Sequence, residues 1–396
     1  MGTRRIVGRI DHVLGDGIER LVLKHHRRRL RRIGWERAFA TSPSLWAESD
    51  PPPRQGCSLG VLIDGAEAFP AILEALERAR SHVHFAGWHV TPGFEMDKEP
   101  PVAVREVLAA LAERVKVRVM LWGGAPLPPP FKPNRRDMRK LADSLRSAAP
   151  VELALDSRER PLHCHHEKLI VIDDEIAFVG GIDLTTLAGD RYDSADHPSR
   201  RGVGWHDVAT RLAGPIVGDV VDHFAMRWNE VTGRALRPAG PPARTGDIEV
   251  QLVRTVPEKI YDSVPKGDFR ILHAYLNALA SARRLIYLEN QFLWSPEVVE
   301  ILKRKLIDPP SEDFRLVVVL PARPAMGDDD TKGQLGVLVE ADGDRGRLVA
   351  CCIYSREGSA AFPVYIHAKV GIVDDPGSKA CRADRNGSSV PFRACW

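Results

Sequence analysis

The pattern His-x-Lys-x-x-x-x-Asp occurs twice in this chain, with an apolar segment between the lysine and the aspartate of each copy. The copies are His166, Lys168 and Asp173, and His367, Lys369 and Asp374. The apolar segments, LIVI and VGIV, are typical of buried strands. Two motifs with one internal spacing indicate an internal duplication. We therefore expect two similar folded units, each with one motif strand.

The sequence around the motifs repeats as well. His166 and His367 lie 201 residues apart, and an apolar strand precedes each at a matching distance: Phe85 is 81 residues before His166, and Tyr287 is 80 before His367. Helical and strand patterns alternate between these points, which is typical of βαβ units. We predict an α/β fold of two similar lobes related by a pseudo-two-fold axis. Each lobe should have a mixed, mostly parallel sheet flanked by helices.

Proline-rich segments mark the expected borders. DPPPRQG and RPAGPPARTGD read as linkers. We predict a basic arm with a linker over residues 1–58, lobe one over 59–240 and lobe two over 248–396. The last residues do not resemble a strand and helix that would complete a sheet, so we expect lobe two to have an incomplete end.

Charge is concentrated at the start of the chain. Residues 1–40 hold 11 Lys/Arg and 4 Asp/Glu, whereas the whole chain has a net charge of +3. The segment LVLKHHRRRLRRIGWER predicts a basic amphipathic helix that contacts anionic lipid, with Trp35 near the interface. A solvated or disordered arm and a nucleic-acid contact remain alternatives.

Location is constrained by what the sequence lacks. No apolar run approaches the roughly 18 residues of a spanning helix, and the N-terminus has no apolar signal core. The six cysteines show no paired spacing. We expect a cytoplasmic protein in a reducing compartment, peripheral on the inner face of the membrane.

The residue types of the motif suit chemistry on a phosphate. Side chains alternate along a strand, so the histidine and lysine of each motif share one face. An imidazole can attack phosphorus or transfer a proton, and the lysine cation neutralises a phosphate oxygen. If the lobes meet at these ends, two histidines and two lysines surround one anion-sized space.

At this point the chain resembles the phospholipase D superfamily, whose active site is defined by paired motifs of this pattern. The likeness covers residues 59–396. GGIDL at 180–184 follows the first motif at the family's spacing, and GVGWHDVATRLAGPIVGDVVDHFAMRWNE and IYLENQF resemble segments of members that act on glycerophospholipids.

The resemblance implies a mechanism. His166 would form a phosphohistidine intermediate, His367 would act as general acid and then base, and Lys168 and Lys369 would hold phosphate oxygens. The histidines would start in opposite protonation states. Asp173 and Asp374 are assigned to the catalytic set. Asp183, Glu289, Asn290 and Gln291 are candidates for substrate binding.

The expected function is hydrolysis or transfer of the phosphatidyl group of a phospholipid at a membrane surface. Alternatives are a cardiolipin-synthase-like phosphatidyltransferase, a nuclease, and a catalytically impaired lipid-binding remnant. We expect no cofactor, no metal, no nucleic-acid partner and no obligate dimer. Cys381 and Arg382 stand where the family has Gly and Ser. We expect this altered ending to lower the activity of the chain.

Overall fold

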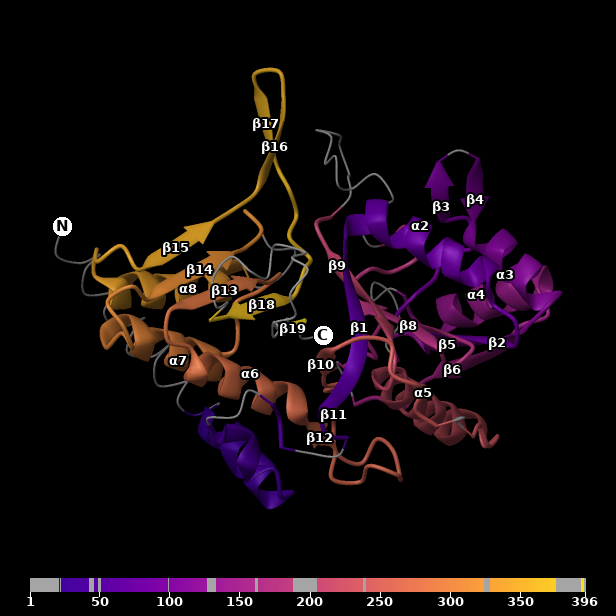
Figure 1. Ribbon diagram of the computed structural model, residues 1–396, viewed down its shortest axis with the longest axis horizontal. Coiled ribbons are helices and arrows are strands. Elements are labelled where there is room, and N and C mark those ends of the chain that lie inside the picture. Colours follow the sequence, from indigo (N-terminus) through magenta and orange to yellow (C-terminus); the bar gives the residue numbers. More distant parts are fainter. Residues whose placement is uncertain are drawn as a thin grey trace.

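The computed structural model consists of two α/β lobes that lie side by side (Figure 1). It describes residues 21, 23–42, 46–48, 51–98, 100–126, 133–160, 163–187, 205–237, 240–323, 328–374 and 393–394. Cys381 and Arg382 lie outside these residues. No helix within the described ranges is both long and apolar enough to cross a membrane.

Lobe one is built on an eight-stranded mixed sheet with the order β10-β1-β9-β8-β7-β2-β5-β6. Its strands are β1 (Arg54–Ile63), β2 (His82–Gly87), β5 (Lys116–Trp122), β6 (Glu152–Asp156), β7 (Leu169–Ile172), β8 (Ile176–Gly180), β9 (Val208–Ala213) and β10 (Ile248–Val250); β3 (Glu95–Lys98) and β4 (Pro101–Ala103) form a separate hairpin. Its helices are α2 (Asp64–Glu77), α3 (Val104–Ala112), α4 (Arg135–Ala148) and α5 (Ile216–Thr232).

Lobe two is built on a five-stranded sheet with the order β15-β14-β13-β18-β19. Its strands are β13 (Leu285–Glu289), β14 (Arg315–Val319), β15 (Leu348–Cys351), β18 (Val370–Val373) and β19 (Arg393–Ala394); β11 (Thr255–Val256) pairs with β12 (Asp268–Phe269), and β16 (Tyr354–Glu357) with β17 (Ala360–Pro363). Its helices are α6 (Arg270–Ser281), α7 (Pro296–Ile307) and α8 (Asp328–Asp342).

The two sheets share a common half, which confirms the predicted duplication. The run β6-β5-β2-β7 of lobe one corresponds to β15-β14-β13-β18 of lobe two. In both runs the first three strands are parallel and the motif strand is antiparallel to its neighbour. Phe85 pairs with Ile170 of the first motif strand, and Leu288 pairs with Gly371 of the second.

The expectation of mostly parallel sheets is wrong for lobe one. Strands β7, β8, β9, β1 and β10 are all joined by antiparallel pairing, and only β2, β5 and β6 run parallel to one another. The motif strand turns back into β8 after Asp173 and Asp174, which both adopt left-handed φ values of 54° and 57°. This tight turn replaces the crossover helix that a parallel arrangement needs.

Both faces of the lobe-one sheet are covered. Phe69, Leu108 and Met138 of α2, α3 and α4 pack on one face, and Phe224 and Trp228 of α5 pack on the other. Each helix places apolar residues at helical spacing toward its sheet. β7 is consequently buried along its whole length, so the first motif is attached to a rigid strand.

The lobes meet through their own small core. Val208 of β9 packs with Val319, Val364, Ile366, Ala368 and Val370 of lobe two. The backbone of His206 is bonded to this segment: its N–H donates to Tyr365, and its carbonyl accepts from His367 and Ala368. The backbone approaching the second motif is therefore fixed against lobe one.

The domain borders differ from those predicted. β1 begins at Arg54, inside the predicted linker, and β10, placed in lobe two, pairs with β1 of lobe one. The start of β1 was misplaced because the prolines before it resemble linker sequence, and β10 was misplaced because its pairing partner is distant in the chain.

The basic helix also differs from the expectation. Helical residues 23–32 lie beneath α6 (Figure 1). Leu30, Trp35 and Ala38 are buried against Phe269, and the Trp35 indole donates to the carbonyl of Gly267 at 3.2 Å. The prediction of Trp35 at a lipid interface is therefore wrong, because its indole is part of the protein core.

Candidate active site

The structure brings the two motif histidines together across the lobe boundary. The ring centroids of His166 and His367 are 6.4 Å apart. His367 is buried, whereas His166 keeps an exposed edge. The expected juxtaposition of the two motifs is present in the fold.

Lys168 lies beside His166 and is held by Asp183. Its Nζ is 3.2 Å from each ring nitrogen of His166 and 2.9 Å from Oδ2 of Asp183. Lys168 and Asp183 are both buried. Asp183, a candidate for substrate binding, thus pairs with the motif lysine.

His166 is suited to nucleophilic attack. Desolvation is the largest effect that lowers the pKa of its imidazole, and the positive charges of Lys168 and Lys369 lower this pKa further. The ring is therefore neutral near pH 7 and has a nitrogen lone pair available.

His367 has a carboxylate partner that the sequence analysis did not identify. Its Nδ1 lies 2.5 Å from Oδ2 of Asp207, a fully buried residue of lobe one. This contact fixes the orientation of the ring, and Nε2 is the ring nitrogen that Asp207 does not contact. Lys369 donates to the carbonyl of His367. Asp207 lies in the GVGWHDV block, but its pairing with a residue 160 positions away is a tertiary feature.

Burial lowers the pKa of His367, and the hydrogen bond with Asp207 opposes that effect only in part. The expectation that His367 is already protonated in the free protein is therefore not supported. An anionic substrate beside the ring would raise this pKa, since a nearby negative charge favours the imidazolium.

The glycine pair after the first motif has a steric reason. A Cβ at Gly181 would lie 2.2 Å from Oδ1 of Asp207, and one at Gly180 would lie 2.6 Å from Cα of Ala209. Glycines at these positions leave room for Asp207 and Ala209 beside the first motif, so that the Asp207 carboxylate can contact His367.

A second charged group joins the lobes next to the histidines. His206 lies 3.1 Å from Asp64 and 3.0 Å from Glu289. Burial opposes the charged form of His206, but the hydrogen bonds with Asp64 and Glu289 prevail and raise its pKa to about 10. His206 is therefore an imidazolium that binds one carboxylate from each lobe.

The predicted substrate-binding residues of lobe two contact protein groups. Glu289 binds His206 and accepts from the Tyr287 hydroxyl. Asn290 donates to the Tyr275 hydroxyl at 3.3 Å, and Gln291 donates to that of Tyr365 at 2.9 Å. All three side chains thus have protein partners here, and their role in substrate binding stays a prediction. Gln291 acts through Tyr365, which lies against Trp205, whose ring centroid is 4.5 Å from that of His367.

The motif aspartates lie at the other end of their strands, so their assignment to the catalytic set is corrected. Asp173 accepts hydrogen bonds from the backbone N–H groups of Arg80, Ser81 and His82, just before and at the start of β2. Asp374 does the same for Arg283, Arg284 and Leu285, just before and at the start of β13. Each aspartate fastens its motif strand to the neighbouring strand.

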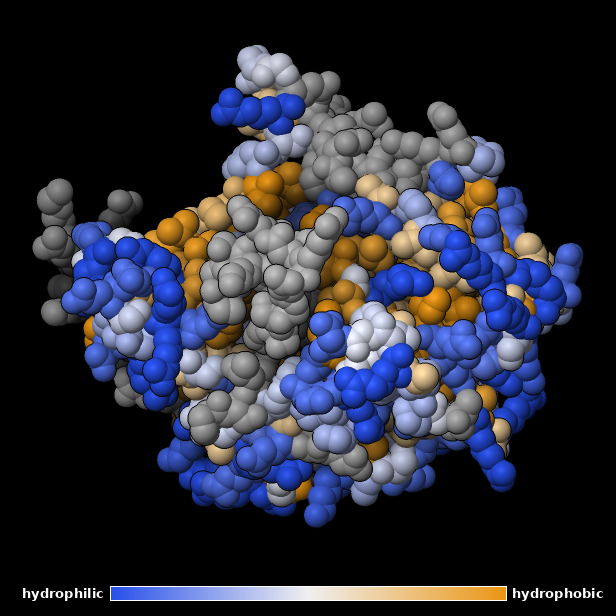
Figure 2. Space-filling model, in the orientation of Figure 1, coloured by the Kyte–Doolittle hydropathy of each residue, from blue (hydrophilic) through white to orange (hydrophobic). Residues whose placement is uncertain are grey.

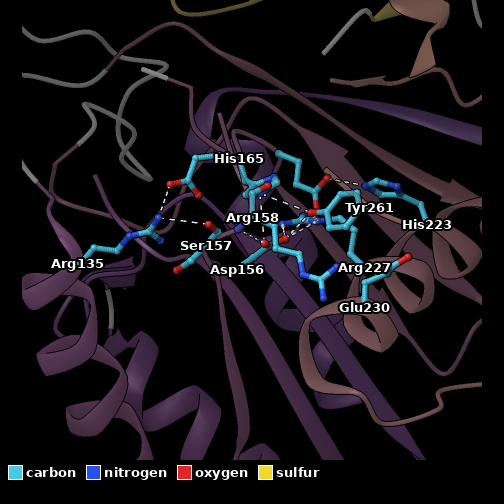
Figure 3. A network of polar contacts seen from close by, with 11 residues as sticks. Arg135, Asp156, Ser157, Arg158, His165, His223, Arg227, Glu230 and Tyr261 are labelled. Atoms are coloured by element: carbon cyan, nitrogen blue, oxygen red, sulfur yellow. Dashed lines mark hydrogen bonds and ion pairs between the residues drawn. The ribbon is translucent and has the colours of Figure 1, made fainter. Parts of the chain in front are cut away.

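The residues that alternate with His166 and Lys168 belong to a buried polar network behind the site (Figure 3). Glu167 binds Arg227 and lies 2.6 Å from His223. Arg227 also binds Asp156 at 2.7 Å, and the Tyr261 hydroxyl donates to the same carboxylate at 2.5 Å. Because neighbouring residues face opposite ways, this network holds the backbone that presents His166 and Lys168.

A cavity of about 410 Å³ adjoins the first motif. His166 and Lys168 line it together with apolar residues of the segment between the lobes, among them Leu252, Val256 and Ile260. Its lining combines this apolar wall with charged groups, among them Arg158, Arg160 and Arg254, and it includes neither His367 nor Lys369 of the second motif.

Comparisons with known proteins agree with the site. No family model matches the chain. Phospholipase D A of Dictyostelium discoideum is 25% identical over 400 residues, covering 82% of this chain and 31% of the relative. Phospholipase D1 of Schizosaccharomyces pombe is 24% identical over 438 residues, covering 83% and 32%. The chain thus spans about a third of the length of these relatives.

Among solved structures, phosphatidylserine synthase of Haemophilus influenzae Rd KW20 has a similar fold, with a TM-score of 0.55 at 12% identity. The match covers 80% of this chain and 76% of the synthase. The relatives and the fold confirm the resemblance that the paired motifs indicated.

Proposed function

We propose that this chain, whose motifs, relatives and fold are those of the phospholipase D superfamily, transfers the phosphatidyl group of glycerophospholipids through a phosphohistidine intermediate. The observation that carries this proposal is the approach of His166 and His367 from separate lobes, with their ring centroids 6.4 Å apart. Lys168 and Lys369 supply two cations at the same place. One neutral nucleophile, one proton carrier and two cations are the groups that a double displacement on a phosphodiester requires.

In the first step, a nitrogen of His166 attacks phosphorus and the bond to the headgroup oxygen breaks. His367 donates its proton to that departing oxygen, and Asp207 stabilises the imidazolium beforehand. The phosphodiester anion itself favours protonation of His367 on binding, because it brings a negative charge next to the ring. Lys168 and Lys369 neutralise the non-bridging oxygens.

In the second step, His367 takes a proton from water or an alcohol, whose oxygen attacks phosphorus. The nitrogen–phosphorus bond breaks and neutral His166 is restored. The two histidines exchange protonation roles between the steps, so they should titrate as a coupled pair. No metal is required for charge neutralisation in this scheme.

A lipid substrate is supported by the apolar wall of the cavity and by the names of the relatives. The hairpin β16–β17 supports it as well. Tyr354 and Phe362 are 54% and 39% exposed there, and the hairpin leads directly into the segment of His367. Figure 2 shows hydrophobic side chains where this hairpin leaves lobe two. Exposed aromatic and apolar groups beside a site suit contact with a lipid surface.

The acceptor decides between a phospholipase and a phosphatidyltransferase, because both use the same intermediate. The fold shared with phosphatidylserine synthase keeps the second activity as the alternative. Nuclease activity is the less favoured option, because the relatives that match most of this chain are named phospholipases D.

Product analysis tests this proposal. The purified chain is incubated with mixed phospholipid vesicles, with and without a primary alcohol. We expect phosphatidic acid in water, and a phosphatidyl-alcohol in its place when the alcohol is present, because the covalent intermediate accepts either nucleophile. Release of nucleotides from DNA or RNA, with no lipid product, would refute the lipid assignment.

We also propose that the basic helix meets anionic headgroups at a membrane surface. Lys24, Arg28 and Arg32 are exposed at successive i+4 positions, opposite the buried Leu30. Since each basic residue near an anionic surface contributes about 1 kcal/mol, replacing all three with alanine should weaken vesicle binding by roughly 100-fold at low salt.

Sedimentation with phosphatidylserine-containing vesicles measures this binding. The matched control replaces Arg139, Lys140 and Arg146, three exposed basic residues of α4. Equal losses in the two triple variants would mean that the helix is not the contact.

A further inference from the structure

Two histidines and an aspartate gather at the end of the first motif strand that lies away from His166. His82 and His84 are alternate residues of β2, and Asp174 belongs to the turn between β7 and β8. One potential ligand atom from each lies within 4.8 Å of the others. The Nε2 of His82 is already 2.8 Å from Oδ1 of Asp174.

Two of the three residues are buried, His82 is partly exposed, and the cluster is incompletely bonded. His84 is 1% exposed and Asp174 is 9% exposed. The Nδ1 of His84 is buried and has no hydrogen-bond partner among the described residues. A buried polar atom without a partner costs about 1–3 kcal/mol, so a retained one calls for a ligand or another compensation.

The surroundings hold the histidine rings in place. Phe224 of α5 stacks on His84 with ring centroids 4.7 Å apart, and the Ser81 hydroxyl lies 2.8 Å from Nδ1 of His82. Metal-bound imidazoles commonly have such a partner on their second nitrogen. A cavity of about 250 Å³ opens onto the cluster and gives a small ion access to it.

Three cations line this cavity, and one carboxylate, that of Glu152, is shared by two of them. Lys116 and Arg118 both pair with Glu152, at 2.9 and 3.4 Å. The third cation, Arg237, is exposed to solvent. The carboxylate of Asp174 is thus the anionic group that faces the two imidazoles.

The geometry points to a zinc site, and we propose that His82, His84 and Asp174 bind one Zn²⁺. Two imidazoles and a carboxylate form a donor set that suits zinc and leaves one coordination position open, whereas Ca²⁺ and Mg²⁺ prefer oxygen ligands. Bonds of about 2.0–2.2 Å place tetrahedral ligands roughly 3.4 Å apart, so side-chain movements of about 1 Å complete the site.

The position of the site defines its role. It joins the start of β2 to the β7–β8 turn, where Asp173 already accepts three backbone hydrogen bonds. The metal therefore stabilises lobe one at the end of β7 opposite the reacting histidines. This role is independent of the proposed phosphodiesterase chemistry.

Zinc titration of the full chain tests the proposal after chelator treatment and removal of the chelator. We expect one Zn²⁺ per chain by calorimetry and elemental analysis, and a rise of several degrees in the unfolding temperature on adding Zn²⁺. His84→Ala and the milder Asp174→Asn should each lose both responses, measured as the zinc-dependent change within each variant.

Two matched histidine variants locate the ion. His25→Ala removes an exposed histidine and His166→Ala removes the nucleophile; both should keep the stoichiometry and the thermal shift. Absence of zinc binding would overturn the proposal. Binding that survives in both His84→Ala and Asp174→Asn, or that disappears in His166→Ala, would place the ion elsewhere and overturn it equally.

Discussion

Replacing His166 with alanine should lower phosphodiester turnover by about 10⁴-fold or more and abolish any covalent phosphoryl label on the protein. The reason is that this variant lacks the atom that bonds to phosphorus, and the remaining groups only bind and polarise the substrate. Steady-state kinetics and a rapid-quench labelling experiment measure the two effects. His25→Ala, which removes an exposed histidine far along the chain, should leave both unchanged.

His367→Ala separates the two roles. Turnover should fall strongly, since the headgroup oxygen would leave without a proton, but a substrate with a good leaving group should still label the protein. A His166→Ala protein that becomes labelled, together with a His367→Ala protein that does not, would reverse the assignment of nucleophile and acid.

Asp207→Asn should have the second largest effect, with kcat lowered by about 10²–10⁴-fold. The asparagine preserves shape but removes the negative charge that lies 2.5 Å from Nδ1 of His367. It can also favour the wrong tautomer of the imidazole, and His367 then cannot transfer the proton that the reaction needs.

The same variant should change the pH dependence in a defined direction. Asp207 raises the pKa of His367 against the lowering effect of burial. Without the carboxylate that pKa falls further, so the activity that depends on protonated His367 should be lost at lower pH than in the unchanged protein. An unshifted pH–rate profile would show that Asp207 does not act through His367.

Asp173→Asn is the matched control for this variant. It lies in a motif, but its carboxylate accepts backbone hydrogen bonds at the far end of β7. The substitution should lower the unfolding temperature, while kcat of the folded protein stays close to that of the unchanged chain.

The sequence predicted the two lobes and the motif residues because both depend on local spacing. His166 and Lys168 share a face by strand alternation, and the duplication gives their counterparts His367 and Lys369. The spacing did not reveal which end of each motif strand meets the other lobe. Asp173 and Asp374 were therefore counted as catalytic, although the structure places them at the opposite end.

Features that depend on pairing between distant segments were missed. Asp207 and His206 become functional candidates only when lobe two places His367 and Glu289 beside them. Strand direction is likewise not encoded in an apolar run, so the antiparallel half of lobe one was not foreseen. The basic helix shows a related ambiguity, since Leu30 and Trp35 would suit either lipid or the protein core.

The stereochemistry at phosphorus tests the central claim most directly. A phospholipid whose phosphorus is made chiral by isotopic labelling is converted in the presence of a primary alcohol, and the configuration of the phosphatidyl-alcohol is determined. Two successive in-line displacements, first by His166 and then by the alcohol, predict retention of configuration. Inversion would mean a single direct displacement and would contradict the phosphohistidine intermediate.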